Sequence, residues 1–288
     1  GQNAGRIRSM NCRGRLAPTP TGFLHVGHAY TFGIAAKRAA GDLVFRVDDL
    51  DSTRCTDEYI AAAIDDLQWL GLAWAEGPDC GGGAGPYFQS QRTGLYLEAW
   101  QQLAAAKRIY PSPHSRRDVE DAALAPHAPV GEEPLFPVNL RPDDWTIPAN
   151  PGCTPWRFRV PDGQTIEFID ENVGLVKRIA GVDFGDFVVW RRDNLAAYEL
   201  AVVVDDHHMG IGEVVRGKDL LTSTARQILL YEALGWKPPR FFHTNLVVGP
   251  DSKRLAKRTS GLMIRELRRK GFSPSTVLSG SVEGTFLK

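Results

Sequence analysis

Two histidines stand three residues apart in the segment His25-Val-Gly-His28, directly after the turn-forming run APTPTG at 17–22. At the start of a helix, side chains with this spacing lie on one face. They would stand beside free backbone N–H groups and the positive end of the helix dipole, which together favour phosphate binding. Gly27 between them would leave room for a flat base to approach the backbone. Histidines at a helix start are also often plain caps or surface residues, so the surrounding elements must decide.

A second segment with possible chemistry is GPDSKRLAKR at 249–258, which follows an expected strand. A lysine on such a loop can neutralise charge that develops on a leaving phosphate. A solvated run of surface charges is the common alternative. The Gly-Pro-Asp turn and the strand before it favour the catalytic interpretation.

The elements around these segments indicate the scaffold. A short strand ends at 16–18, a helix follows at 27–40, a second strand covers 43–47, and an amphipathic helix covers 57–70. The second strand ends in an acidic loop with Asp48, Asp49 and Asp51. Strand–helix–strand–helix order predicts a parallel, doubly wound sheet of the Rossmann type, and therefore an α/β fold.

The remaining elements predict how the chain is divided. Helices are expected at 94–107 and 222–234, strands at 156–160, 165–169, 187–190 and 241–248, and either a strand or a buried helix at 198–204. Prolines break the pattern between 110 and 150, which indicates an inserted subdomain. We predict a first half of the nucleotide-binding domain at 12–108, an inserted α+β subdomain at 109–192, a second half at 193–245, and the basic loop with a short C-terminal helical segment at 246–288.

The segment RLAPTPTGFLHVGHA (15–29) resembles the opening of glutamyl-tRNA synthetases, where the HxGH tetrad is the class I signature. The likeness continues through RVDDLD (46–51), YFQSQR (87–92) and VVVDDHHMGIGEVVRGKDLLTSTARQ (202–227). It reaches segment 249–258 at the place of the class I KMSKS loop. Because the blocks come in the family's order, together they are far more specific than any one of them.

The resemblance implies ATP-dependent activation of glutamate. A glutamate carboxylate attacks the α-phosphorus of ATP, pyrophosphate leaves and glutamyl-adenylate forms, a displacement that depends on positioning and charge neutralisation. His25 and His28 would donate hydrogen bonds to the phosphates, and Lys257 would stabilise the pyrophosphate. Mg²⁺ would accompany ATP, without a dedicated carboxylate cage. The implied ATP-binding residues are Thr21, Gly27, His28, Arg254 and Lys257.

The same resemblance implies a glutamate pocket. Arg15 would hold a substrate carboxylate, Asp48 would pair with the α-ammonium group, and Arg216 would read the side-chain carboxylate. Two planar guanidinium groups suit a dicarboxylic amino acid, and glutamine would leave one of them uncompensated. The implied glutamate-binding residues are Arg15, Ala17, Thr19, Asp48, Tyr198 and Arg216.

The loop at 249–258 departs from the family pattern. Arg254 takes the place of the first lysine and Ala256 the place of the serine, while Lys257 is retained. Arginine keeps the charge but not the compact geometry of an ammonium group. We therefore expect an effect on rate more than on activity itself.

Only 30 residues follow Arg258, whereas glutamyl-tRNA synthetases continue into a large helical anticodon-binding part. In this respect the chain resembles the glutamyl-Q tRNA(Asp) synthetases, truncated paralogues that activate glutamate without tRNA and transfer it to queuosine in the anticodon of tRNA(Asp). We expect no anticodon-binding domain, and the anticodon stem-loop of tRNA(Asp) as the partner. The alternatives are a truncated synthetase that charges the 3′ end of tRNA(Glu), an inactive RNA-binding paralogue, and a small HxGH nucleotidyltransferase.

Many of these paralogues bind zinc through a CxC pair after a Tyr-Pro. Here Ser112 and His114 stand in place of both thiols. His127 and Cys153 are near in sequence, but their spacing fits no standard zinc pattern. We expect that zinc is absent, and the sequence assigns no metal-ligating residues.

Composition limits the remaining possibilities. The net charge is zero, yet residues 1–41 carry six basic and no acidic side chains, and 253–270 carry eight basic side chains and one acidic. Such clusters fit either a polyanion at one face or solvated helix faces. Four scattered cysteines fit free thiols in a reducing cytoplasm. No apolar run approaches the roughly 18 residues of a membrane span, so we expect a cytoplasmic protein without membrane contact, and a monomer.

Overall fold

A twisted, mainly parallel sheet forms the centre of the computed structural model, which describes residues 12–122, 134–249, 255, 262–282 and 284–288. Strand β1 (Gly14–Leu16) pairs in parallel with β2 (Leu43–Phe45), and β8 (Glu213–Gly217) pairs in parallel with β9 (Arg240–Thr244). The backbone amide that begins β8 donates a hydrogen bond of 3.2 Å to the carbonyl of Arg13, which joins the two strand pairs. The predicted parallel α/β sheet is confirmed.

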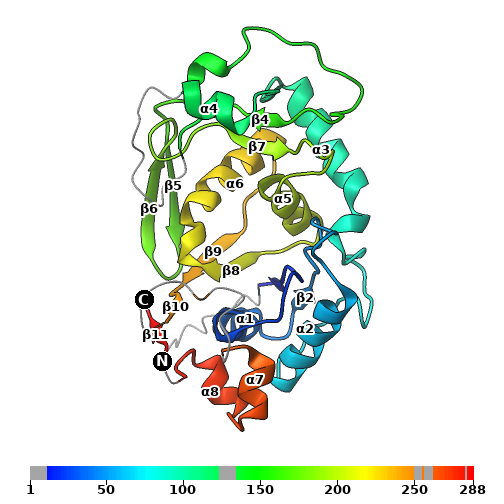
Figure 1. Ribbon diagram of the computed structural model, residues 1–288, viewed down its shortest axis with the longest axis vertical. Coiled ribbons are helices and arrows are strands. Elements are labelled where there is room, and N and C mark those ends of the chain that lie inside the picture. Colours follow the sequence, from blue (N-terminus) through cyan, green and yellow to red (C-terminus); the bar gives the residue numbers. More distant parts are fainter. Residues whose placement is uncertain (1–11, 123–133, 250–254, 256–261, 283) are drawn as a thin grey trace, which may run out of the picture.

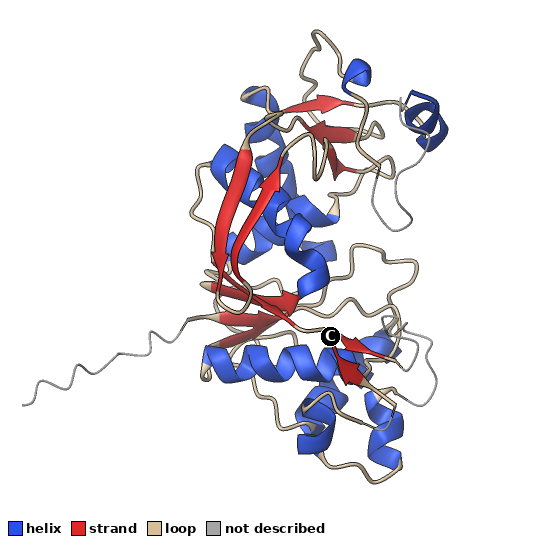
Figure 2. Ribbon diagram, turned by 90° about the vertical axis from the view of Figure 1, so that its left-hand side faces the viewer, coloured by secondary structure: helices blue, strands red, loops and turns tan. Residues whose placement is uncertain are grey.

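Helices cover both faces of this sheet, as Figures 1 and 2 show. On one side, a buried apolar cluster is built from β1, β2, α1 (Val26–Ala39), α2 (Asp57–Trp69), α7 (Ile264–Arg269) and α8 (Pro274–Leu278). On the other side, a second cluster is built from α3 (Thr93–Ala105), α5 (Tyr198–His208), α6 (Leu221–Leu234) and strands of the insertion. The doubly wound arrangement follows from these two cores.

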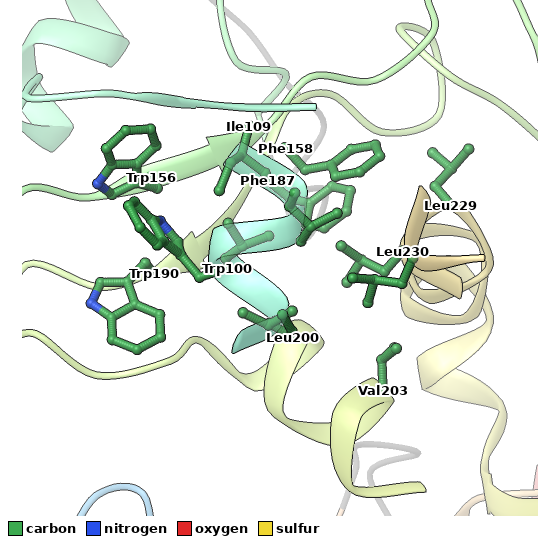
Figure 3. Packing of buried hydrophobic residues seen from close by; sticks show 14 of the residues in the cluster. Trp100, Ile109, Trp156, Phe158, Phe187, Trp190, Leu200, Val203, Leu229 and Leu230 are labelled. Carbon is green, nitrogen blue, oxygen red and sulfur yellow. The ribbon is translucent and has the colours of Figure 1, made fainter. Parts of the chain in front are cut away.

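The second cluster is rich in tryptophan (Figure 3). The rings of Trp100 in α3 and Trp156 in β4 (Trp156–Phe158) meet edge to face, with centroids 5.0 Å apart. Trp190 of β7 (Phe187–Trp190) lies in the same cluster, fully buried. Burial of such large rings stabilises the contact between the insertion and the catalytic part.

The insertion contains an antiparallel sheet in the order β3-β4-β7, with β3 at Ile109–Pro111 and α4 at Arg116–Ala122. The hairpin of β5 (Thr165–Asp170) and β6 (Gly174–Ile179) instead extends the central sheet, because Asp170 pairs in parallel with Phe241 of β9. Part of the expected insertion is therefore hydrogen-bonded to the catalytic sheet. The four-part division of the chain remains a prediction.

Several elements differ from the sequence-based expectation. Residues 198–204 are helical, as part of α5, and β6 and β8 were not expected. The expected strand at 241–248 is two strands, because β10 (Val247–Val248) leaves β9 to pair with β11 (Phe286–Leu287). Single 3₁₀ turns occur at Gln89–Gln91, Val138–Leu140 and Lys218–Leu220. None of the described helices has both the length and the apolar character that crossing a membrane requires.

Candidate active site

His25 and His28 form a reciprocal cap at the start of α1. The Nδ1 atom of His25 accepts a hydrogen bond from the amide of Gly27 at 3.1 Å, and the amide of His25 donates to Nδ1 of His28 at 3.1 Å. The two rings lie 4.0 Å apart between centroids. Because Nδ1 of each ring accepts a backbone N–H, the ring proton of each neutral imidazole is on Nε2. Both histidines are thus fixed as Nε2–H donors at a helix N-terminus.

Gly27 has a structural role in this cap. A Cβ atom at this position would lie 2.9 Å from Cε1 and 3.0 Å from Nδ1 of the His25 ring. Any larger residue would therefore push His25 out of its capping position. The expected approach of a base to the backbone of Gly27 stays a prediction.

The KMSKS-type loop reaches the histidines through its described flanks. Arg254 and Lys257 lie outside the described residues. The amide of Val26 donates to the carbonyl of Leu262 at 3.0 Å, and the amide of Ile264 donates to the carbonyl of Leu24 at 2.9 Å. The chain that leaves the loop is thereby held directly beside His25.

A buried network of ion pairs lies at the ends of β1 and β2. Arg15 donates through Nε to Asp206 at 3.2 Å, and Arg46 donates through Nη1 to the same carboxylate at 2.7 Å. Arg46 also donates through Nε to Asp48 at 2.7 Å. Because all four side chains are less than 9% exposed, their charges interact in a low dielectric and depend on one another.

A second group completes the network around Asp205. This carboxylate accepts hydrogen bonds from Nε of Arg92 at 2.5 Å, Nε2 of Gln89 at 2.9 Å and the Tyr96 hydroxyl at 2.8 Å. Arg46 lies 3.8 Å from it. Three buried arginines thus face three buried aspartates. Arg46, Arg92, Asp205 and Asp206 all lie within the family motifs, but the sequence did not assign roles to them.

The two aspartates nearest Arg15 and Arg46 differ in their ionisation. Burial raises the pKa of Asp48 to about 6, against the opposing effect of Arg46. Burial also acts to raise the pKa of Asp206, but Arg15 and Arg46 outweigh it and hold this pKa below its usual value. Asp48 is therefore the carboxylate that would gain more from an additional cation, such as an ammonium group.

Arg216 differs from the other buried arginines in the described part of the chain. Its Nη2 donates to Thr224 Oγ1 at 2.7 Å and to Gln227 Oε1 at 2.9 Å, and its Nε lies 3.5 Å from Nε2 of His243. All three partners are neutral. Its Nη1 atom is buried, and no described group accepts a hydrogen bond from it. A buried donor of this kind is unfavourable unless an acceptor joins it, and a carboxylate fits best.

Tyr198 connects Arg216 with the ion-pair network. Although 43% of the residue is exposed, burial of its hydroxyl raises its pKa, with the charges of Arg216 and Arg15 acting in the opposite direction. Asp48 also contributes to this pKa. Three other predicted glutamate-binding residues, Arg15, Asp48 and Arg216, therefore lie within electrostatic reach of the Tyr198 hydroxyl.

The loop between β1 and α1 borders this region. The amide of Asp48 donates to the carbonyl of Pro18 at 3.0 Å, which fixes the backbone between Ala17 and Thr19. The amide of Thr21 donates to the carbonyl of Thr19 at 2.9 Å, which tightens the turn. The loop thus runs from the predicted glutamate pocket to the two histidines.

A cavity of about 830 Å³ lies between the insertion and the start of α5. Ser112 and His114 line it on one side, and Tyr198 and Glu199 on the other. Its basic lining residues are His114, Arg116, Arg157, Arg191, Arg192 and Arg226.

The described residues contain no group of three or more histidine, cysteine, aspartate or glutamate side chains that could hold a metal ion. His127 lies outside the described residues. The absence of zinc stays a prediction.

Residues 11–121 and 148–283 match the family described as tRNA synthetases class I (E and Q), catalytic domain. The chain belongs to this family. The resemblance to glutamyl-Q tRNA(Asp) synthetases is confirmed by a protein of that name from Symbiobacterium thermophilum, which is 46% identical over 92% of this chain and 84% of its own length. A glutamate–tRNA ligase 2 from Syntrophus aciditrophicus is 39% identical over 95% of this chain and 57% of its own length.

A solved structure supports the fold. The glutamate-tRNA synthetase from Elizabethkingia anophelis matches 90% of this chain with a TM-score of 0.70 and 26% identity. The chain spans about half, 53%, of that solved protein. The class I catalytic fold is therefore shared with glutamate-tRNA synthetases.

Proposed function

We propose that this chain is a ligase that activates L-glutamate with ATP and then transfers the glutamyl group to queuosine in the anticodon of tRNA(Asp). The observation that carries the activation step is the buried Nη1 donor of Arg216 beside a network of paired charges. The acceptor is supported by the 46% identity to a protein named glutamyl-Q tRNA(Asp) synthetase.

Glutamate has three charged groups, and the site offers a partner for each. The ammonium group would bind Asp48, whose burial makes an added cation favourable. Arg15 would hold one carboxylate, and Nη1 of Arg216 would receive the side-chain carboxylate. Tyr198, with its hydroxyl among these charges, would close the pocket. Ala17 and Thr19, on the loop between β1 and α1, would also contact the bound glutamate.

ATP would bind at the start of α1. The Nε2–H groups of His25 and His28 would donate to its phosphates, assisted by the helix dipole. We propose that Thr21 and Gly27 lie beside the nucleotide, and that Arg254 and Lys257 bind the leaving pyrophosphate. Mg²⁺ would arrive as part of the MgATP substrate, and we assign it no protein ligand.

The bond changes in the two steps balance. A carboxylate oxygen of glutamate bonds to the α-phosphorus, and the bond to the bridging oxygen of pyrophosphate breaks. A hydroxyl of the acceptor then attacks the glutamyl carbonyl carbon, AMP leaves with the bonding electrons, and the hydroxyl proton passes to solvent. The cavity next to Tyr198 offers room for the acceptor nucleoside, and its arginines suit the flanking phosphates.

We further propose that the protein acts as a cytoplasmic monomer.

A second acceptor has specific support. The relative from Syntrophus aciditrophicus is named a glutamate–tRNA ligase, so the 3′ end of tRNA(Glu) is the alternative. The lower identity, 39% against 46%, places it second.

The test is glutamyl transfer from radiolabelled glutamate. We would compare tRNA(Asp) with queuosine, tRNA(Asp) without queuosine, and tRNA(Glu), after measuring glutamate-dependent exchange of pyrophosphate into ATP without tRNA. We expect exchange, and labelling of queuosine-containing tRNA(Asp) only. Labelling of tRNA(Glu) alone would establish the alternative, and absence of exchange would refute activation.

A further inference from the structure

A buried aspartate–histidine pair lies behind Arg216. Asp170 ends β5 and His243 lies in β9, and Oδ2 of Asp170 is 2.6 Å from Nδ1 of His243. Asp170 also accepts the backbone amides of Asn172 at 3.0 Å, Val173 at 2.8 Å and His243 at 3.0 Å. These hydrogen bonds outweigh the effect of burial and hold the pKa of Asp170 below its usual value. The ionised carboxylate therefore fixes the proton of His243 on Nδ1 and leaves Nε2 as an acceptor.

The acceptor nitrogen of His243 faces the groups that hold Arg216. Its Nε2 lies 2.9 Å from Thr224 Oγ1 and 3.5 Å from Nε of Arg216. Burial, and then the charge of Arg216, lower the pKa of His243 to about 4, although Asp170 and Asp219 oppose them. The imidazole is therefore neutral at pH 7. The Thr224 hydroxyl has one proton and two acceptors within reach, Nε2 of His243 at 2.9 Å and the carbonyl of Leu220 at 3.0 Å. Its oxygen accepts from Nη2 of Arg216 at 2.7 Å, and Nε2 of His243 can also accept from Nε of Arg216.

The other partner of Nη2 is held in a similar way. Nε2 of Gln227 donates to Glu199 at 2.7 Å, so that its Oε1 faces Nη2 of Arg216 at 2.9 Å. Glu199 itself accepts the Ser223 hydroxyl at 2.8 Å. Both direct acceptors for Nη2 are thus neutral groups with a carboxylate behind them: Glu199 contacts Gln227 directly, and Asp170 is linked to Thr224 through His243.

We propose that the Asp170–His243 pair is a positioning element for amino-acid recognition: through Thr224 it fixes the guanidinium of Arg216 so that Nη1 faces the side-chain carboxylate of bound glutamate. The inference rests on the proposed glutamate site. It is supported by the geometry, because a direct carboxylate partner would neutralise Arg216, whereas neutral partners orient it and leave its charge for the substrate.

The pair also connects two parts of the chain. Asp170 belongs to the β5–β6 hairpin within the predicted insertion at 109–192, whereas His243 and Arg216 belong to neighbouring strands of the central sheet. The hairpin would therefore contribute to glutamate selectivity without contacting the amino acid.

The test uses variants that change one hydrogen-bonding group. His243→Asn can keep a donor toward Asp170 but has no acceptor at the place of Nε2, whereas His243→Gln can place an amide oxygen there. Thr224→Val removes the hydroxyl with little change in shape. Thr222→Val is the matched control on the same helix, because the Thr222 hydroxyl accepts from Arg178 and is not among the described partners of Arg216.

The readouts are equilibrium dialysis of glutamate, glutamine and ATP, together with the thermal midpoint of each variant. For Thr224→Val and His243→Asn we expect glutamate binding to weaken about tenfold or more, as for a lost hydrogen bond to a charged group. The preference for glutamate over glutamine should fall, and ATP binding should stay within about twofold. His243→Gln should recover part of the loss, and Thr222→Val should match the wild type.

Two results would overturn the inference. One is unchanged glutamate affinity in Thr224→Val, which decides the matter even where His243→Asn fails to fold. The other is an equal loss for glutamate, glutamine and ATP, which indicates a merely structural role. Failure of tRNA(Asp) labelling would refute the proposed acceptor only, because these binding measurements need no transfer.

Discussion

Glutamate binding is expected to weaken about tenfold when the pH falls from 7 to 5, because Asp48 must be ionised to bind the ammonium group. Burial raises the pKa of this carboxyl to about 6. A group with this pKa is roughly 90% ionised at pH 7 and roughly 10% ionised at pH 5. The ammonium and the carboxyl groups of free glutamate change little over this range, so the loss arises in the protein.

Ionisation of Asp48 also affects the stability of the folded protein. In the folded protein the pKa of Asp48 lies above the usual 3.8, so ionisation is unfavourable for folding, and this destabilisation develops as the pH rises from about 4 to 6. A bound ammonium group favours the ionised form and offsets this effect. Below pH 6, binding should therefore release a proton.

The assay is equilibrium dialysis of radiolabelled glutamate without ATP, at half-unit steps between pH 5 and 7.5. Asp48→Asn is the control, since it should bind glutamate more weakly at pH 7 and lose this part of the pH dependence. An unchanged wild-type affinity across the range, or the same slope in the variant, would refute the role of Asp48. A slope shared by both proteins would indicate that groups other than Asp48 titrate.

Three further predictions concern other parts of the chain. His25→Ala should lower the rate of pyrophosphate exchange roughly 100-fold and the free energy of unfolding by about 1 kcal/mol. His25→Asn should restore the stability but not the rate. Equal exchange rates in the wild type and both variants would contradict the role of the ring. Asp186→Asn should destabilise the protein by about 3 kcal/mol in urea unfolding, because the carboxylate accepts hydrogen bonds from Tyr110 and from Nε of Arg141, the latter at 2.7 Å. An unchanged urea midpoint would be inconsistent with this prediction. Asp66→Asn should stabilise the protein at pH 7 and not at pH 4, because burial raises the pKa of this carboxyl from 3.8 to about 6. The pKa difference corresponds to a stabilisation of at most about 3 kcal/mol. A variant that is less stable than the wild type at pH 7 would contradict this prediction.

The local features of the fold could be predicted from the sequence, and the long-range pairings could not. The helix expected at 27–40 is Val26–Ala39, because the capping histidine and the residues around Gly41 mark its ends locally. Strand β8 was missed because its five residues include a buried glutamate and a buried arginine, which hide the apolar pattern. Motif resemblance predicted Arg216 as a residue of the glutamate pocket, but nothing in the sequence shows that its contacts are neutral.

The ion-pair network shows the same limit. Arg46 and Asp206 are 160 positions apart, and only the fold reveals that they share a hydrogen bond. A signal was present in the sequence, because two aspartates directly follow the apolar residues 200–204 of α5. Carboxylates on a buried helix need partners. This signal predicts buried cations, but it does not tell which arginines they are.

The distribution of charge in the proposed site would favour glutamate over glutamine. The three arginines around Asp48, Asp205 and Asp206 are matched by these three carboxylates, so the network is neutral without substrate. An amino acid's ammonium and α-carboxylate add no net charge to it. In the proposed pocket the side chain would meet Arg216, whose direct partners in the described part of the chain are all neutral. The carboxylates of Asp170 and Glu199 lie behind His243 and Gln227. Glutamine could offer Nη1 an amide oxygen, whereas glutamate offers an anion. Because hydrogen bonds between charged groups are stronger by about 1 to 2 kcal/mol than those to a neutral acceptor, the arrangement would favour glutamate by roughly 5- to 30-fold at this one contact.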